Sequence, residues 1–260
     1  MSQLLSIGQR VRLGVVRSRE LNMKTIRWIP VLTVLVFLAS GFCELRAADE
    51  DGVALAIIYD TSGSMKDPVL DRSGQSAPKY VIANRSLLAV ARQIQNFATN
   101  TGTGTPRKIY TALYTFQGSQ AREAIKFGPF DAAALQDWAE RFSNPSGSTP
   151  LGNTLTAASQ TVLNSPLSRK HVLVITDGMN TAGPDPAHVL PRLKQQATQQ
   201  GTSLSVHFVA FDVDAKVFDP VKKLGATVVG AADEAQLNSQ LQFILQRKIL
   251  LEEEEPTKTK

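Results

Sequence analysis

Short apolar runs alternate with longer amphipathic segments along most of this chain. Runs with few charges and many β-branched residues are typical of strands that are buried on both faces of a parallel sheet. We predict strands at 53–59, 108–116, 171–176, 203–211 and 226–229, and helices at 80–97, 132–142, 152–163, 186–200, 215–224 and 233–250. Because strands and helices alternate, right-handed crossovers would build an α/β fold, with a mainly parallel central sheet and helices on both faces.

Hard oxygen ligands follow the first predicted strand. Asp60, Ser62 and Ser64 occupy every second position of the turn that leaves it, and Gly63 allows the backbone to fold back there. Parallel sheets place their ligands at the carboxyl ends of the strands. Mg²⁺ prefers about six oxygen ligands at roughly 2.0 to 2.1 Å. Since one carboxylate leaves a divalent ion under-neutralised, we expect such a site to recruit a further anion.

The sequence Asp60-x-Ser62-x-Ser64 after a buried strand resembles the metal-ion-dependent adhesion site of von Willebrand factor type A (vWA) domains. That family also uses a threonine on a second loop and an aspartate on a third. Thr149 lies just before a predicted helix, and Asp177 lies at the tip of a predicted strand, so both stand in the matching order. The resemblance therefore rests on three loops rather than on one short motif.

One loop departs from the family pattern. Family members often carry two glycines before the threonine, whereas this chain has Gly147-Ser148, which bears on the flexibility of the loop more than on ligation. The resemblance covers roughly residues 52–248 and implies a single Rossmann-like vWA domain, which we assign to residues 52–250. In some family members a lateral movement of the last helix, here 233–250, changes the affinity for the partner.

The resemblance also implies a function. Asp60, Ser62, Ser64, Thr149 and Asp177 would hold Mg²⁺, or else Mn²⁺ or Ca²⁺, because oxygen-only sites discriminate weakly among these ions. An Asp or Glu carboxylate from a protein partner would complete the shell of the ion. The protein is then expected to be an exported, metal-dependent protein-binding module and not an enzyme.

Three other interpretations compete with this one. The short motif alone also occurs as a turn that caps the following helix. An acidic Mg²⁺ site at the end of a strand also serves phosphoryl transfer. Enzymes of that design, however, carry a second carboxylate where this chain has Ser62, and no lysine is obviously positioned to neutralise a phosphate. The third interpretation is a non-catalytic subunit of a larger envelope or secretion assembly.

Several further polar residues lie near the expected site. Asp67 and Asp71 follow the first loop in a polar segment that we interpret as solvated. Asp212 and Asp214 follow a predicted strand and would share the rim of the sheet with the metal, where they could tune the site or cap the next helix. Asn180 could hold the third loop by hydrogen bonds. The three histidines have no spacing that suggests a zinc site.

Residues 1–48 form an N-terminal leader with a predicted signal peptide. The stretch 29–42 is uncharged and mostly apolar, too short to span a bilayer comfortably but suited to a signal-peptide core, and Met23 offers an alternative start. Cys43 would allow lipidation, although Phe42 departs from a lipoprotein box, and an uncleaved anchor is the other alternative. We therefore expect a periplasmic or secreted protein, attached to a membrane only through such an anchor or lipid.

The net charge of +5 belongs to the leader. Its 48 residues carry seven of the 28 Lys and Arg and two of the 23 Asp and Glu, which leaves 21 of each sign. The chain beyond the leader is therefore neutral as a whole, and it offers no compositional argument for nucleic-acid or anionic-membrane binding. The single cysteine lies in the leader, so no disulfide could stabilise the domain. Residues 251–260 are expected to form a charged, flexible tail.

Overall fold

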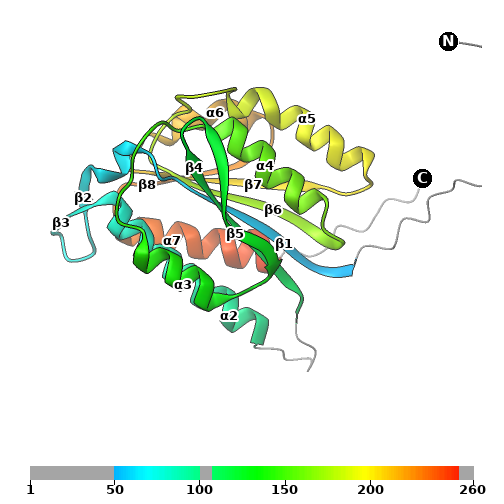
Figure 1. Cartoon of the computed structure of the whole chain (residues 1–260), viewed down its shortest axis with the longest axis horizontal. Helices are drawn as coiled ribbons and strands as arrows, with labels where there is room; N and C mark the ends of the chain where they lie inside the picture. The colour runs from blue at the N-terminus through cyan, green and yellow to red at the C-terminus, as the bar shows by residue number, and fades with distance from the viewer. Residues whose placement is uncertain (1–49, 100–106, 252–260) are drawn as a thin grey trace, which may run out of the picture. The chain divides into compact units, whose positions relative to one another are not determined.

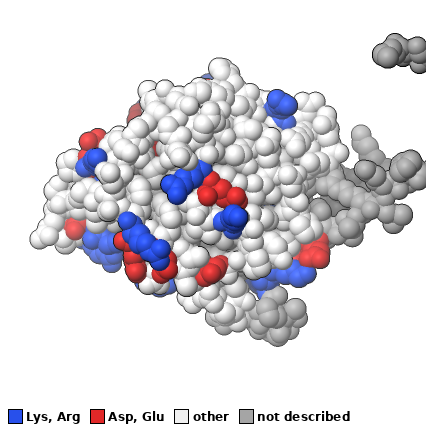
Figure 2. Space-filling view, in the orientation of Figure 1, with Lys and Arg blue, Asp and Glu red and all other residues white. Residues whose placement is uncertain are grey.

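A computed structural model describes residues 50–99 and 107–251. The predicted leader, and the tail beyond Leu251, lie outside these residues. Within 50–99 and 107–251, no helix combines the length and the apolar character needed to cross a bilayer. On the face drawn in Figure 2, acidic and basic side chains are interspersed.

A six-stranded sheet forms the centre of the fold (Figure 1). Its strands, in spatial order, are β5 (Gln120–Pro129), β4 (Ile109–Gln117), β1 (Glu50–Tyr59), β6 (Leu167–Thr176), β7 (Leu204–Phe211) and β8 (Thr227–Ala231). All neighbours pair in parallel except β5, which runs antiparallel to β4. The predicted α/β fold with a mainly parallel sheet is thus confirmed.

Helices cover both faces of this sheet. One face carries α2 (Lys79–Thr99), α3 (Ala132–Arg141), α7 (Glu234–Ile244) and the π-helical turn η3 (Leu245–Leu250), and the other carries α4 (Leu151–Leu163), α5 (Pro186–Gln199) and α6 (Asp219–Lys223). Figure 1 shows these two layers, with α4 and α5 on one side of the sheet and α2, α3 and α7 on the other.

Strand β1 divides the core into two halves because successive side chains of a strand point to opposite faces. Leu55 and Ile57 pack with α2 and α7, whereas Ala56 and Ile58 pack with α4. These side chains are almost completely buried, and a fully buried aliphatic side chain of this size contributes about 1.5–3 kcal/mol. The hydrophobic run therefore fixes β1 at the centre of the sheet, with its polar tip at the edge.

Three strands escaped the sequence-based prediction. Strand β5 follows a turn at Gly118, which has a φ of 62°, and its charged, half-exposed side chains hide the strand pattern. Strands β2 (Pro68–Leu70) and β3 (Ser76–Pro78) form a small antiparallel hairpin between the first loop and α2. The segment that we interpreted as a solvated loop is therefore a hairpin, in which Asp71 accepts hydrogen bonds from the backbone N–H groups of the turn.

The two predicted C-terminal helices differ in detail from the structure. The segment predicted as one helix at 215–224 begins with a 3₁₀ turn, η2 (Ala215–Phe218), and continues as α6. The last helix is α-helical only to Ile244 and then widens into the π-helical turn η3. Both segments nevertheless occupy their predicted places in the chain.

Candidate metal centre

Three loops meet at the carboxyl edge of the sheet. Because β1 and β6 are neighbouring parallel strands, with Tyr59 opposite Ile175, the loops that follow them start side by side. The Asp60 N–H donates to the Ile175 carbonyl oxygen at 3.0 Å, which places Asp60 next to the end of β6. The second loop leads into α4, whose first turn lies at the same edge.

The predicted ligands of the first and third loops form a hydrogen-bonded chain. Asp60 accepts from the Ser62 N–H (2.8 Å) through one carboxylate oxygen and from the Thr176 hydroxyl (2.6 Å) through the other. The hydroxyl oxygens of Ser62 and Ser64 lie 3.1 Å apart, and Ser64 donates to Asp177 Oδ1 at 2.8 Å. Four of the five predicted ligands are therefore in contact, directly or through one another.

Thr149, the fifth predicted ligand, reaches the cluster through its backbone. The Gly63 N–H donates to the Gly147 carbonyl at 3.1 Å, which joins the first loop to the second. The Thr149 N–H donates to the Thr181 hydroxyl at 2.8 Å, which joins the second loop to the third. Thr149 is buried, and no hydrogen bond among the described residues links its hydroxyl to the other four side chains.

The departure from a double glycine in the second loop has a structural explanation. Gly147 has a φ of 86°, the left-handed conformation that favours glycine, so the one glycine retained is the one the turn requires. Ser148 instead donates from its hydroxyl to the Gly118 carbonyl at 3.0 Å. The serine thus ties the second loop to the turn between β4 and β5.

The third loop is fastened to the start of α4. Asn180 accepts from the Gly152 N–H (3.3 Å) and donates to the Gly183 carbonyl (3.1 Å), so it holds the loop by hydrogen bonds as predicted. A Cβ placed on Gly152 would lie 2.0 Å from the Pro184 carbonyl oxygen. Only a glycine at this position allows the backbone of α4 to approach the third loop so closely.

Burial makes the cluster electrostatically receptive to a cation. Burial and the neighbouring charge of Asp177 raise the pKa of Asp60 to about 6, although hydrogen bonds from Ser62 and Thr176 partly offset both effects. Two buried carboxylates with serine and threonine hydroxyls around them match the oxygen ligands that Mg²⁺ and Ca²⁺ prefer. No group of three or more His, Cys, Asp or Glu within residues 50–99 and 107–251 forms a metal cluster, so any shell here needs oxygen ligands besides the carboxylates.

The sequence-based search missed a lysine at this site. The Nζ of Lys79 lies 3.1 Å from Asp177 Oδ2 and 3.1 Å from Asp212 Oδ2, and its side chain is only 7% exposed. Burial lowers the pKa of Lys79, but its hydrogen bonds and ion pairs with Asp212 and Asp177 outweigh that effect and raise the pKa above the ordinary value. The ammonium therefore stays charged. One feature of the sequence could have indicated this contact: Lys79 lies at the start of a helix, where its side chain can reach the aspartates that follow two of the strands.

The two acids after β7 have different roles. Asp212 reaches Lys79 and so belongs to the electrostatic surroundings of the cluster. Asp214 accepts from the Lys216 N–H at 3.0 Å and caps η2, as expected for a residue before a helical turn. The capping role that we considered for this pair is therefore found at Asp214, whereas Asp212 contacts the lysine.

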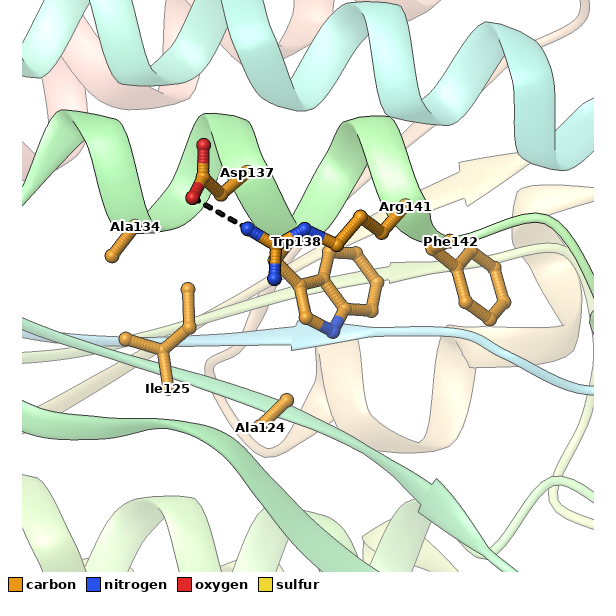
Figure 3. Close-up of a pocket in the computed structure, with 7 residues that line it drawn as sticks. All are labelled: Ala124, Ile125, Ala134, Asp137, Trp138, Arg141 and Phe142. Atoms are coloured by element: carbon orange, nitrogen blue, oxygen red, sulfur yellow. Dashed lines mark hydrogen bonds and ion pairs between the residues drawn. The ribbon is translucent and has the colours of Figure 1, made fainter.

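A hollow on the surface of the described region lies apart from this cluster. It has a volume of about 520 Å³ and is open to solvent between β5 and α3, with Ala124 and Ile125 on one side and Trp138 and Phe142 on the other. Figure 3 shows the Trp138 ring reaching from α3 toward β5, beside the ion pair that Asp137 and Arg141 form at 2.7 Å. None of the five predicted ligands lines this hollow, so the hollow and the cluster of ligands are separate features.

Comparisons with known proteins agree with this architecture. The sequence model for the von Willebrand factor type A domain matches residues 55–239. Among solved structures, the vWF domain of the type V pili tip protein Mfa5 from Porphyromonas gingivalis is similar, with a TM-score of 0.55 and 14% identity over 80% of this chain and 99% of that one. A search of curated proteins found no match.

Two longer proteins share the same fold. The D319A mutant of the PilB minor pilin from Streptococcus sanguinis has a TM-score of 0.56 and 14% identity, over 76% of this chain and 61% of the pilin. Proximal thread matrix protein 1 from the mussel byssus, with a zinc-occupied MIDAS motif, has a TM-score of 0.54 and 14% identity, over 76% of this chain and 48% of that protein. This chain thus spans about three fifths of the pilin and half of the byssus protein.

The family match covers well over half of the chain and coincides with the sheet and the three loops described above. Domains of this type are protein-interaction modules. The chain belongs to the von Willebrand factor type A domain family.

Proposed function

We propose that this protein is an exported, metal-dependent protein-binding module. Asp60, Ser62, Ser64, Thr149 and Asp177 would hold Mg²⁺, Mn²⁺ or Ca²⁺ at the carboxyl edge of the sheet. The observation that carries the proposal is the hydrogen-bonded chain from Asp60 through the two serines to Asp177. The Ser64 hydroxyl already donates to Asp177 and the Ser62 hydroxyl lies 3.1 Å from the Ser64 hydroxyl, so these oxygens need little reorganisation to turn to a cation.

The partner protein would need a carboxylate that can bind the ion. An ion held by two carboxylates and neutral hydroxyls still has room for water in its shell, and an Asp or Glu of the partner can displace that water. Met179, two residues beyond Asp177, is 61% exposed at the same edge. An exposed large apolar side chain beside a charged site favours a protein partner, which can cover both at once.

The structural relatives support export and metal binding. Two of these relatives are pilus proteins, and the structure of the byssus protein has a zinc-occupied MIDAS motif. By this analogy we propose that the protein is periplasmic or secreted, which agrees with the signal peptide predicted in its leader. Zinc joins Mg²⁺, Mn²⁺ and Ca²⁺ as an ion to be tested.

Calorimetric titration of each ion into the metal-free protein tests the site. We expect saturable binding by the wild-type protein, and its loss in Asp60→Ala, because that change removes the carboxylate at the centre of the cluster. Asp219→Ala, on α6, is the matched control and should bind like the wild type. A wild-type protein that is folded but takes up none of the four ions would contradict a resident metal site.

The partner's carboxylate is tested with a short acidic peptide. We expect the peptide to bind only in the presence of a divalent ion and to be released by EDTA, since its carboxylate would be a ligand of the ion. A matched peptide with Asn and Gln in place of Asp and Glu should not bind. Equal binding of both peptides, or binding unaffected by EDTA, would argue against this mode of docking.

A further inference from the structure

Lys79 occupies a position that its own helix does not favour. It is the first residue of α2, where the helix dipole disfavours a positive charge, and its side chain is almost completely buried, which also disfavours a charge. Local preference therefore does not account for a lysine here. The two carboxylates that its ammonium contacts, those of Asp177 and Asp212, do.

The ammonium shares Asp177 with the metal cluster. One oxygen of that carboxylate accepts from Ser64, within the cluster, and the other is 3.1 Å from Lys79 Nζ. A divalent ion in the cluster would draw on the same negative charge that the ammonium already partly neutralises. Because like charges repel strongly in a partly buried site, Lys79 and the ion oppose each other.

Asp212 moderates that opposition. Its carboxylate lies 3.1 Å from the same ammonium but belongs to the end of β7, outside the ligand set. Asp212 is the one non-glycine residue of the described region with a positive φ, 53°, a conformation that costs energy and persists only where the surroundings hold it. The Asp212 carboxylate, held in this conformation, neutralises part of the positive charge of Lys79. The ammonium therefore does not pair with Asp177 alone.

We propose that Lys79 and Asp212 are positioning residues that set the affinity of this site for its divalent ion: Lys79 weakens binding of the ion, and Asp212 strengthens it. This inference rests on the proposed metal-binding function. The weakening has a consequence for recognition, because an ion that shares Asp177 with an ammonium keeps more of its positive charge. That residual charge favours a partner's carboxylate as the final ligand.

Two substitutions separate the charges with little change of shape. Lys79→Met keeps an unbranched, helix-compatible side chain in a buried place. Asp212→Asn keeps the size of the side chain, and asparagine tolerates the left-handed conformation. The test measures the Kd for Mg²⁺ by calorimetry, alongside the urea midpoint of each metal-free variant, so that a folding defect is not mistaken for a change in affinity.

The two variants should shift the Kd in opposite directions. We expect Lys79→Met to bind Mg²⁺ about tenfold more tightly, as for removal of one elementary charge near a partly buried divalent ion, and Asp212→Asn to bind about threefold more weakly. Lys79→Arg should stay close to the wild type. Lys108→Met, which removes an exposed charge paired with Glu50, is the control for net charge and should leave the Kd unchanged.

Each outcome decides the inference. Unchanged or weaker binding by folded Lys79→Met, or a shift of both variants in the same direction, would overturn it while leaving the metal site intact. If Lys79→Met does not fold, Asp212→Asn decides: weaker binding supports the inference, and unchanged or tighter binding overturns it. Uptake of Mg²⁺ by Lys79→Met but not by the wild type would support the inference and contradict the proposed resident ion. No uptake by either folded protein would overturn both.

Discussion

At the scale of single residues, Asp60 carries a conflict between stability and function. It is completely buried, and its raised pKa means that the folded protein binds the proton of this carboxyl more tightly than the unfolded chain does. Stability from this group is therefore present at low pH and is lost as the pH rises toward and through about 6. A bound cation would remove the conflict by favouring the ionised form.

Asp60→Asn should therefore stabilise the metal-free protein while abolishing metal binding. The pKa difference corresponds to on the order of 3 kcal/mol at pH 8, of which we expect the amide to recover about 1–3 kcal/mol. Urea denaturation in EDTA measures the gain. The same titration with Mg²⁺ should stabilise the wild type but not the variant. A metal-free variant less stable than the wild type would show that the lost hydrogen bonds outweigh the charge.

At Gly152, the start of α4 lies so close to the third loop that there is no room for a side chain. Gly152→Ala would place a Cβ against the Pro184 carbonyl, so the third loop must move. We expect a loss of about 1–3 kcal/mol in the free energy of unfolding and weaker Mg²⁺ binding, because the same loop carries Asp177. Gly128→Ala is the control, since a Cβ there meets no atom within 4 Å. Similar effects of both changes would contradict the close-approach argument.

At the scale of elements, a buried carboxylate joins the hairpin of β2 and β3 to the last helix. Glu234, at the start of α7, is completely buried and accepts hydrogen bonds from the Arg72 side chain (2.9 Å), the Arg72 N–H (3.2 Å) and the Arg85 side chain (2.8 Å). The hairpin directly follows the first loop of the candidate site. The contact thus links that loop to the helix whose movement changes affinity in some family members.

Glu234→Gln should loosen this link. The amide loses the charge that two arginines share, and we expect a loss of about 1–2 kcal/mol in the free energy of unfolding, at the low end for a buried pair because both arginines are partly exposed. Asp137→Asn, which breaks a well-exposed pair with Arg141, is the comparison and should cost less than about 1 kcal/mol. An equal cost for both would mean that burial of Glu234 adds nothing.

At the scale of the whole molecule, a histidine pair makes the sheet sensitive to acid. His171 on β6 and His207 on β7 lie with Nδ1 and Nε2 3.3 Å apart in the core. Burial lowers the pKa of His207 to about 4, with a smaller effect from Lys248, and burial together with His207 and Arg169 lowers the pKa of His171. The spacing of the histidines in the sequence suggested no zinc site. In the structure, the rings of His171 and His207 stack on each other.

The sign of the pH effect follows from these lowered pKa values. The unfolded chain takes up protons below about 6.5, whereas the folded protein does so only near 4. Stability from His207 is therefore complete above pH 6.5 and is lost as the pH falls toward 4, by on the order of 3 kcal/mol. The contribution of Asp60 has the opposite sign, so a single pH profile would mix the two.

A difference between two proteins isolates the histidine. We expect the free energy of unfolding of the wild type, minus that of His207→Gln, to fall between pH 7 and pH 5, since Asp60 contributes equally to both. Trp138, the one tryptophan outside the leader, provides the fluorescence signal for urea denaturation. His188→Gln, on α5, is the matched control. A difference that stays flat over this pH range would contradict a buried, neutral His207.

Sequence alone determined the fold class, the order of its main elements and the loops that carry Asp60, Thr149 and Asp177, because hydrophobic periodicity and turn chemistry are local properties of the chain. Tertiary structure decided what depends on contacts between distant segments. Strand β5 takes its place by pairing with β4 and not from its own pattern, and the hairpin of β2 and β3 is fastened through Glu234. Lys79 reaches Asp177 across 98 positions of the chain. Such a pairing leaves no periodic trace in the sequence, since only the packing of α2 against the sheet brings the two charges together.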